Sequence, residues 1–396
     1  MLADRVKEIG ASPTMMVAAE AKKLKSEGID VIDLSMGEPD FHTPNNIKDA
    51  GISAIEENKT RYTLNQGTNE LRIAISAKLK RDNALEYNFN EIIVSSGAKQ
   101  SVYNSILVIV NPGDEVIIPA PYWVSYPAMV SLAGGKSVIV QTDESTGFKV
   151  TSAQLNSAIT SKTKMIILCN PSNPTGSAYT RKELEDLAEV VLKYGIYVLS
   201  DEIYEKLVYD DFNFTSFASL GSEIKNKTII VNGISKTYAM TGWRIGYTAA
   251  PENIISAINK IQSHTTSHAS SISQHAAIEA IAGPQYVIND MLNEFKKRRE
   301  YFYNELISIS GITCYKPIGA FYLFPNISRL FHKRSDVLKV ENSFDFSMYL
   351  LYDAHIAAVP GSAFGSEGYL RLSYSTSMEH LHEAIYRLKK SLSKIQ

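Results

Sequence analysis

The feature that most constrains the fold of this chain is a repeated exchange between short apolar segments and longer segments with helical patterning. From about residue 45 to residue 235, predicted helices alternate with strands such as EIIVS at 91–95 and IYVLS at 196–200. The strands are apolar at successive positions rather than at every second one, which is typical of strands buried on both faces. Parallel strands need crossover connections, which the helices between them supply. The sequence therefore predicts an α/β domain with a doubly wound, mostly parallel sheet.

The predicted elements follow one another in a regular order. We expect strands at 91–95, 112–119, 136–141, 164–169, 196–200 and 227–231. We expect helices at 45–57, 68–81, 98–110, 123–133, 151–160 and 180–194. In sheets of this kind, ligands bind at the carboxyl ends of the strands, so the residues that follow each strand are the first place to look for chemistry.

Both ends of the chain depart from this alternation. A helix is expected at 13–27 near the start, and a long charged helix at 288–308 opens the other end. Beyond it come a strand pair in ITCYKPIGAFYLFPNI, a helix at 344–354, strands HIAAV and YLRLSY, and a final helix. We interpret the helix at 288–308 as a connector with a solvated face. The chain is thus divided into a large domain and a smaller α+β domain formed by both ends, which span residues 46–285 and residues 1–45 with 286–396.

Charge and composition exclude several classes of protein. The 40 basic and 42 acidic residues leave a net charge of −2, so no basic excess points to nucleic acid or to an anionic membrane. No run approaches the roughly 18 apolar residues that a membrane span needs, and the first residues lack the apolar core of a signal peptide. A cytoplasmic location is therefore expected. The two cysteines, Cys169 and Cys314, are expected to be reduced thiols, and no metal site is predicted.

The turn after the strand at 227–231 carries the strongest chemical signal. It contains Ser235 and Lys236 and leads to Arg244 in the motif TGWR. A lysine held in an apolar cleft loses its charge readily, and a neutral amine forms a Schiff base with a carbonyl. A hydroxyl and a guanidinium are suitable partners for a phosphate monoester. Together they suit pyridoxal 5′-phosphate, although an ordinary surface turn accounts for the same three residues.

Three other strand ends present groups that suit this ligand. Gly97, Ala98 and Lys99 open a helix directly after a strand, where free backbone N–H groups and the helix dipole attract an anion. Trp123 can stack on a planar ring or fill the core. Asn173 lies in the rigid turn NPSNPTG, which fixes the direction of its amide unless the asparagine is incidental.

Further polar groups fall at the remaining strand ends and in the smaller domain. Asp201 can keep a pyridine nitrogen protonated or cap a helix, and Tyr204 can bond the ring's phenolic oxygen. Arg371, inside the apolar strand YLRLSY, suits either a substrate carboxylate or a rim salt bridge. Gly37 permits close approach of backbone to a ligand, and it also suits a plain turn. Tyr62 offers only a polar aromatic tip.

Taken together, these motifs resemble those of the class I and II aminotransferases, which are pyridoxal-phosphate enzymes of fold type I. Within that family the chain resembles the bacterial and plastid-type aspartate aminotransferases and their prephenate-using relatives. The resemblance covers nearly the whole chain and rests on LSMGEPDF, TRYTLNQGTNELR, SSGAKQ, PAPYWVSYP, NPSNPTG, SDEIYE, NGISKTYAMTGWRIGY, GAFYLF, VPGSAFG and LRLSY.

The resemblance implies a role for each matching residue around the cofactor. Lys236 would bind the cofactor covalently and then act as the general acid and base. Asp201 would pair with the pyridine nitrogen, while Tyr204 and Asn173 would bond the ring oxygen. Trp123 would stack on the ring and border the substrate. The phosphate would be surrounded by Gly97, Ala98, Lys99, Ser235 and Arg244.

The resemblance also implies how the substrate and a second subunit contribute. Arg371, with Asn173 and Gly37, would hold the α-carboxylate of the amino acid. Tyr62 would reach the phosphate of the neighbouring subunit, so that a homodimer with shared active sites is expected. The implied substrates are small amino acids and 2-oxo acids that react by a ping-pong scheme.

The sequence favours aspartate and 2-oxoglutarate as substrates but leaves alternatives open. Residues 262–275 contain no second arginine to bind a dicarboxylate side chain, which counts against aspartate. Some prephenate-using relatives carry lysine near position 143, where this chain has Asp143, and this difference favours aspartate over prephenate. The alternatives are a prephenate or aromatic aminotransferase, a kynurenine-type enzyme or β-lyase, and a non-catalytic regulatory domain that binds the cofactor. His264 and His268 are four residues apart and are expected to share a polar helix face rather than a metal.

Overall fold

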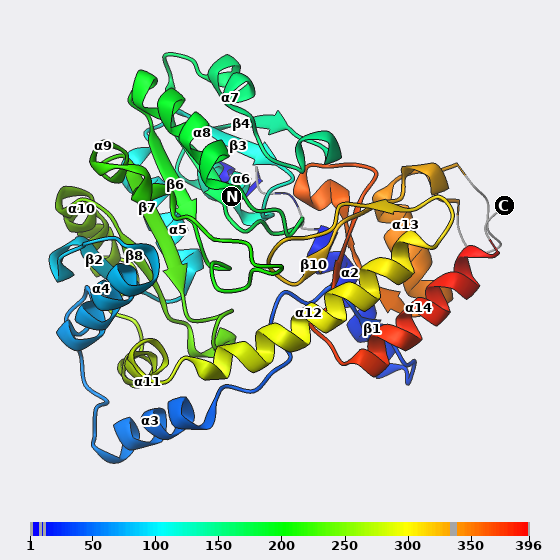
Figure 1. The fold of residues 1–396 in the computed structure, drawn as a ribbon, viewed down its shortest axis with the longest axis horizontal. Helices are drawn as coiled ribbons and strands as arrows, with labels where there is room; N and C mark the ends of the chain where they lie inside the picture. The colour runs from blue at the N-terminus through cyan, green and yellow to red at the C-terminus, as the bar shows by residue number, and fades with distance from the viewer. Residues whose placement is uncertain (1–2, 8–9, 11–12, 333–338, 395–396) are drawn as a thin grey trace.

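The larger lobe of the molecule is built on one twisted sheet (Figure 1). The computed structural model describes residues 3–7, 10, 13–332 and 339–394. The strand order is β2-β8-β7-β6-β5-β3-β4; β8 runs antiparallel to β2 and β7, and the other paired strands are parallel. This confirms the predicted α/β class. The strands are β2 (Ile92–Ser95), β3 (Glu115–Ala120), β4 (Lys136–Gln141), β5 (Thr163–Cys169), β6 (Tyr197–Asp201), β7 (Thr228–Gly233) and β8 (Gly246–Ala249).

Successive residues of the central strands face two different cores. Met165 and Ile167 of β5 pack into one cluster, whereas Ile166 and Leu168 pack into another, and each is at most 2% exposed. This explains why these strands are apolar at every position. The edge strand β4 is the exception, because several of its side chains are exposed.

Helices cover both faces of this sheet (Figure 1). The helices are α3 (Asn45–Glu56), α4 (Asn69–Asn83), α5 (Ala98–Ile109), α6 (Ser125–Leu132), α7 (Ser152–Ala158), α8 (Arg181–Tyr194), α9 (Ser222–Lys225), α10 (Glu252–Ser263) and α11 (Ser271–Ala282). Six of them, α3 to α8, were predicted, most with bounds within a few residues of those found, whereas α9, α10 and α11 were not predicted.

The smaller lobe combines both ends of the chain. Strand β1 (Ile32–Asp33) pairs in parallel with β12 (Ile356–Ala357), and Val17 and Ala21 of α2 pack against Leu351 and Ala357. The predicted strand pair at 312–327 is three short strands, of which β9 pairs with β11 while β10 pairs with β14. The other elements are α1 (Asp4–Lys7), α2 (Pro13–Ser26), β9 (Thr313–Cys314), β10 (Tyr322–Leu323), β11 (Pro325–Asn326), α13 (Ser343–Tyr349), β13 (Val359–Pro360), β14 (Leu370–Ser373) and α14 (Met378–Leu392).

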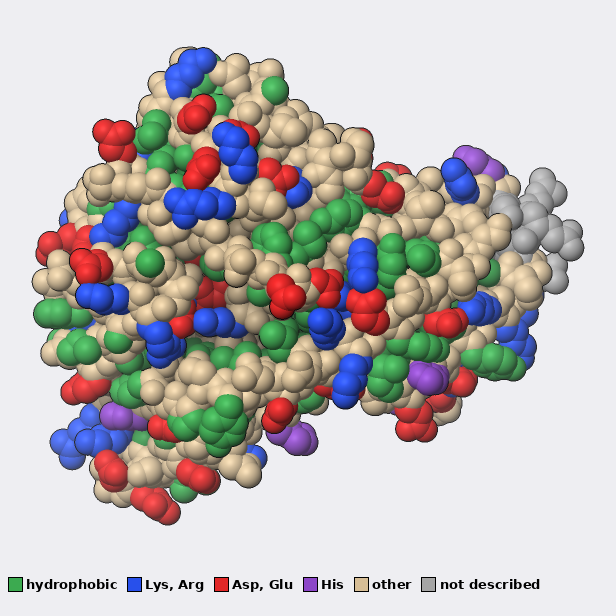
Figure 2. All heavy atoms as spheres, in the orientation of Figure 1, with side chains coloured by type: hydrophobic (Ala, Val, Ile, Leu, Met, Phe, Trp, Pro, Cys, Tyr) green, Lys and Arg blue, Asp and Glu red, His purple; other side chains and the backbone are tan. Residues whose placement is uncertain are grey.

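A single long helix, α12 (Tyr286–Ile307), runs from the larger lobe to the smaller one (yellow in Figure 1). Charged side chains of both signs lie over this helix on the face seen in Figure 2, but the interpretation of the helix as a solvated face is wrong for its other side. Arg299 is fully buried, donates to the Pro317 carbonyl at 2.9 Å and to Asp210 at 2.7 Å, and lies 4.6 Å from the centre of the Tyr209 ring. Buried guanidinium groups need such partners, and a charge count along the helix does not reveal them.

Two other expectations also need correction or completion. His264 and His268 do not share a helix face, because α10 ends at Ser263 and His268 lies in the loop beyond it.

Short 3₁₀ turns occur at Phe89–Glu91, Glu144–Thr146, Phe217–Leu220, Thr241–Trp243, Ser328–Leu330 and Gly361–Phe364. The predicted helix at 344–354 ends in a π turn at Leu350–Ala354. No helix in the described part of the chain combines the length and the apolar character needed to cross a membrane.

Candidate active site

A cavity of about 330 Å³ lies at the carboxyl ends of the central strands, where they meet the smaller lobe. Every residue predicted for the site lines this cavity except Gly97 and Tyr62. The chain therefore brings together groups from segments that are far apart in sequence. The lining residues are Gly37, Ala98, Lys99, Trp123, Tyr126, Cys169, Asn173, Asp201, Ile203, Tyr204, Ser235, Lys236, Thr241, Arg244, Tyr322 and Arg371.

Lys236 is held as a poorly solvated amine in the turn after β7. Burial lowers the pKa of this amine to about 8, and the nearby carboxylate of Glu38 opposes the shift. Its Nζ donates a hydrogen bond to the carbonyl oxygen of Gly37, which comes from the other end of the chain. An amine with this pKa both gives and takes protons near neutral pH and attacks carbonyl groups.

Asp201 is the last residue of β6 and lies in register with Cys169 of β5 and Val231 of β7. Its side chain accepts a hydrogen bond from the Tyr126 hydroxyl at 2.7 Å and one from the Ile203 N–H at 3.3 Å. Burial raises the pKa of Asp201 to about 6, although both hydrogen bonds oppose the shift. The carboxylate is therefore oriented and poorly solvated, which suits pairing with a cationic partner in the cavity.

One corner of the cavity has the features of an anion site. Helix α5 begins at Ala98, and the first N–H groups of a helix have no partner within it. Gly97 has φ +85°, and a Cβ there would lie 2.3 Å from Nη2 of Arg244, so only glycine allows the guanidinium to lie against this turn. The Ser235 side chain and the Arg244 guanidinium complete a donor set for a phosphate group.

Arg371 lies on β14, on the side of the cavity formed by the smaller lobe, and is 6% exposed. Its Nη1 donates to Asn173 Oδ1 at 3.1 Å and its Nη2 to the Ser35 carbonyl at 2.6 Å. Its buried Nε has no hydrogen-bond partner among the described residues. Each Nη carries a second N–H group, so the guanidinium keeps donors for a ligand carboxylate besides these two bonds.

Lys99 adds a fourth cation to the cavity, beside Lys236, Arg244 and Arg371. Its Nζ lies 5.0 Å from the centre of the Trp123 ring, and burial together with the charge of Arg244 lowers its pKa. A cavity with this many cationic side chains is suited to a ligand that carries several negative charges.

Tyr62 is the predicted residue that the fold leaves outside. Its side chain is 93% exposed, and its ring lies 5.6 Å from that of His268. Five lining residues were not predicted. Cys169 closes a predicted strand and Ile203 lies two residues after Asp201, so both had a positional signal. Tyr322 lies in the motif GAFYLF, which belongs to the family resemblance, but no role was predicted for it. The unpredicted residues are Tyr126, Cys169, Ile203, Thr241 and Tyr322.

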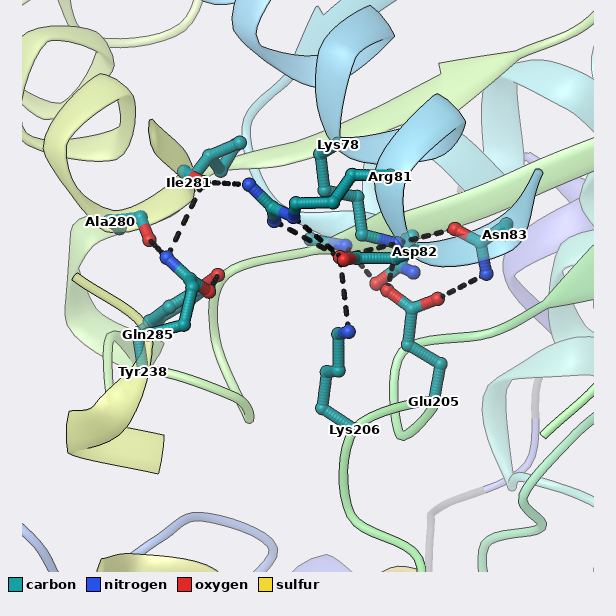
Figure 3. A network of polar contacts seen from close by, with 12 residues as sticks. Lys78, Arg81, Asp82, Asn83, Glu205, Lys206, Tyr238, Ala280, Ile281 and Gln285 are labelled. Atoms are coloured by element: carbon teal, nitrogen blue, oxygen red, sulfur yellow. Dashed lines mark hydrogen bonds and ion pairs between the residues drawn. The ribbon is translucent and has the colours of Figure 1, made fainter. Parts of the chain in front are cut away.

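A network of polar and charged side chains joins α4 to residues 205 and 206 (Figure 3). Lys78 of α4 pairs with Glu205, and the Asn83 side chain donates to the same carboxylate at 2.9 Å. Asp82 accepts from Arg81 at 2.8 Å and pairs with Lys206 at 3.1 Å. The network therefore ties the end of α4 to the segment that follows Asp201 and Tyr204.

Known proteins resemble this chain over nearly its whole length. A family model described as aminotransferase class I and II matches residues 29–388. An aspartate aminotransferase of Bacillus sp. (strain YM-2) is 48% identical over 98% of both chains, and a probable aspartate/prephenate aminotransferase of Rickettsia conorii is 46% identical over 100% of this chain and 99% of its own. The structure of the aspartate aminotransferase from Rhizobium meliloti superposes with a TM-score of 0.97 at 43% identity, with both chains covered completely. That of Thermus thermophilus with maleate has a TM-score of 0.93 at 36% identity, with 99% of each chain covered.

Proposed function

The chain belongs to the class I and II aminotransferase family, and on that basis we propose that it transfers the amino group of L-aspartate to 2-oxoglutarate with pyridoxal 5′-phosphate as cofactor. The observation that carries this proposal is the meeting of Lys236, Asp201 and Arg371 in one cavity. Relatives named aspartate aminotransferase at 46–48% identity support the substrate, as does the neighbour with maleate, which is a four-carbon dicarboxylate.

The residues of the cavity fit this cofactor. Ser235, Arg244 and the backbone of Gly97, Ala98 and Lys99 would hold its phosphate, and the Gly97 turn leaves room for the guanidinium. Trp123 would lie against the ring, Asp201 would face the pyridine nitrogen, and Asn173 and Tyr204 would bond the ring oxygen. When bound, the cofactor supplies a carbonyl that carries the amino group and a ring that accepts electrons.

The protein's own side chains then carry out the proton chemistry. Lys236 takes the proton from the substrate Cα, for which an amine with a pKa of about 8 is suited. Arg371 would hold the α-carboxylate through the remaining N–H groups of its guanidinium, which would fix the Cα–H bond relative to Lys236. Asp201 keeps the ring nitrogen protonated. Because the amino group is carried between two substrates by one bound group, the kinetics are ping-pong.

We assign the second carboxylate of aspartate to the side chain of Lys99. Lys236, Arg244 and Arg371 already have roles in this proposal, so Lys99 is the cation that remains. Its ammonium lies 5.0 Å from the centre of the Trp123 ring, which would border the substrate. A single ammonium holds a carboxylate as a point charge and less selectively than a guanidinium. This arrangement is compatible with prephenate as a second amino acceptor, which the names of the Rickettsia relatives support.

The two lobes and a second subunit complete the proposal. Residues 46–285 would bind the cofactor, while residues 1–45 and 286–396 would close over the substrate and expel water. Tyr62, too exposed to serve its own cavity, would reach the phosphate of a neighbouring subunit in a homodimer.

Single-turnover absorbance of the cofactor-bound protein tests the proposal. We would mix it in turn with aspartate, glutamate, tyrosine and kynurenine, and then regenerate it with 2-oxoglutarate or prephenate. Rapid loss of the cofactor's visible band with aspartate and glutamate, and its return with 2-oxoglutarate, is the expected result. A protein without such a band, or a band that survives in Lys236→Ala, would refute the covalent role of Lys236. Comparable rates with 2-oxoglutarate and prephenate would instead establish a double specificity.

A further inference from the structure

Tyr322 lines the cavity with a hydroxyl to which neither the resemblance nor the mechanism above assigns a role. It lies on β10 and is fully buried, and its oxygen lies 2.8 Å from the Tyr204 hydroxyl. Tyr204 is the residue that would bond the ring oxygen of the cofactor. The two tyrosines belong to different lobes, so this hydrogen bond joins the lobes inside the site.

Tyr322 is also held against the arginine that would bind the substrate carboxylate. Strands β10 and β14 are antiparallel neighbours with Tyr322 opposite Ser373, and the Arg371 guanidinium lies 4.6 Å from the centre of the Tyr322 ring. A Cβ on Gly37 would lie 3.3 Å from the Tyr322 oxygen. Its ring and its hydroxyl are therefore confined on several sides, which is what a fixed hydrogen-bond geometry requires.

Either hydroxyl can donate in this hydrogen bond, and the surroundings favour Tyr322 as the donor. A positive charge near a phenol strengthens it as a donor, and the Arg371 guanidinium lies directly over the Tyr322 ring. If Tyr322 donates to the Tyr204 oxygen, the single proton of Tyr204 is free to be donated into the cavity. Hydrogen bonds arranged in a chain strengthen one another, so Tyr204 is then the better donor.

Building on the proposed function, we propose that Tyr322 is a positioning residue that acts through Tyr204, by donating a hydrogen bond that directs the Tyr204 proton to the ring oxygen of the cofactor. A hydrogen bond donated to that oxygen favours the form in which the oxygen carries a full negative charge. It therefore promotes loss of the proton that the ring oxygen shares with the Lys236 nitrogen. The pH at which the bound cofactor's visible absorbance changes reports this proton.

The structure provides a matched control in the same core. Tyr209 and Tyr374 are a second pair of buried tyrosines with their hydroxyls 3.4 Å apart, and the Tyr374 hydroxyl donates to the Ala320 carbonyl at 3.1 Å. Neither residue lines the cavity. Tyr374→Phe thus removes a buried hydroxyl of the same cluster without touching the site.

The experiment is a pH titration of visible absorbance in the cofactor-bound protein without substrate. Tyr322→Phe keeps the ring beneath Arg371 and removes only the hydroxyl. We expect its midpoint to rise by roughly 0.3 to 1 pH unit, the worth of one neutral hydrogen bond. Tyr204→Phe should raise the midpoint further, and adding Tyr322→Phe to Tyr204→Phe should cause no additional shift. Tyr374→Phe should leave the midpoint unchanged, and thermal unfolding of each variant confirms that it is folded.

Three outcomes would overturn the inference while leaving the proposed function intact. The first is an unchanged or lowered midpoint in Tyr322→Phe. The second is a shift of the midpoint by Tyr322→Phe that is equally large in the parent and in Tyr204→Phe. The third is a shift in Tyr374→Phe as large as that in Tyr322→Phe. If the parent protein showed no visible cofactor band at all, the proposed function itself would fail and this role would fail with it.

Discussion

At the scale of single residues, the hydrogen bonds already made by Arg371 define how it can take a substrate. Asn173 and the Ser35 carbonyl each accept from one N–H group, on Nη1 and Nη2, so a second N–H on each of these nitrogens remains for a carboxylate. Arg371→Lys keeps the charge but loses the planar pair of donors. We expect kcat/KM for aspartate to fall about 10- to 100-fold, mostly through KM, since one charge-assisted hydrogen bond is worth about 1.5–3 kcal/mol.

This prediction is checked by half-reaction rates measured over a range of aspartate concentrations. Arg181→Lys is the control, because this arginine is 61% exposed and pairs with Glu185 on the surface of α8. An unchanged KM in Arg371→Lys would show that the guanidinium does not bind the substrate.

Glu202 supplies a pH-dependent contribution to stability. It is fully buried, and burial together with the charge of Glu205 raises its pKa to about 7 from 4.5. Between these two values the unfolded chain loses the Glu202 proton while the folded protein keeps it. The free energy of unfolding therefore falls as pH rises through this window, by roughly 1.4 kcal/mol per pH unit for this group, and the loss is complete above pH 7.

Glu202→Gln removes this dependence and imitates the protonated side chain. Its carbonyl oxygen can keep the bonds from the hydroxyls of Ser200 and Ser216, both at 2.8 Å, and Oε2 of the wild-type residue has no partner to lose. We expect the stability of the variant relative to the parent to grow from pH 5 to pH 7 and then stay constant. Thermal unfolding at several pH values measures it, and a difference independent of pH would contradict the assignment.

Most of the site residues that were predicted from the sequence share a position in the fold, at the end of a strand, rather than a residue type. Lys99, Asp201 and Lys236 follow apolar strands, and parallel strands bring their carboxyl ends to one edge of the sheet. Tyr126 and Tyr322 reach the cavity through contacts with residues 75 and 118 positions away, namely Asp201 and Tyr204. Such contacts depend on how helices and lobes pack, which no local pattern expresses.

At the scale of elements, the charged network at the end of α4 makes this helix sensitive to the loss of a single charge. Lys78 and Glu205 have side chains only 6% and 4% exposed. Lys78→Met or Glu205→Gln alone removes the nearest opposite charge from a buried ion and should destabilise the protein by about 3–5 kcal/mol, although Asn83 still bonds the remaining group. The double variant should recover most of this loss.

Thermal unfolding of the four proteins measures the coupling. Lys80→Met provides the control on the same helix, because the side chains of Lys80 and its partner Glu86 are 70% and 78% exposed and solvent screens their attraction. Additive losses in the double variant would mean that Lys78 and Glu205 act independently.

Strands that are buried on both faces, and the helices between them, were predictable from the sequence. The parallel strands are apolar on both faces, and their periodicity differs clearly from that of the helices between them. Strand β8 was not predicted, because GYTA is short and follows a 3₁₀ turn rather than a helix. The buried side of α12 was also missed, because Arg298 and Arg299 resemble surface residues until their partners from other segments are known.

At the scale of the whole molecule, the exposed Tyr62 leads to a test of shared active sites. Lys236→Ala should be inactive, and Tyr62→Ala should bind the cofactor weakly. In a mixed dimer, one site regains both Lys236 and the tyrosine of its neighbour. Mixing the two variants after reversible dissociation should therefore restore roughly a quarter of the parent activity, because half the dimers are mixed and each has one complete site.

Activity measured before and after mixing, at a fixed low cofactor concentration, provides the readout. No gain over the sum of the separate variants would show that Tyr62 does not serve a neighbouring site.

The sequence indicated two domains from the change in patterning at both ends, but the pairing of β1 with β12 joins segments that no local signal connects.

That pairing of the first and last parts of the chain has a consequence for how the protein is made. Domains fold as they leave the ribosome, from the N-terminal side onward. The groups assigned to the cofactor lie between residues 97 and 244, whereas Arg371 and the strands that hold the Gly37 segment are synthesised last. We expect a nascent chain to acquire the cofactor-binding cavity before it can recognise a substrate. The reactive amine of Lys236 is thus formed early in synthesis, and the selectivity that restrains it is completed only with the final strands.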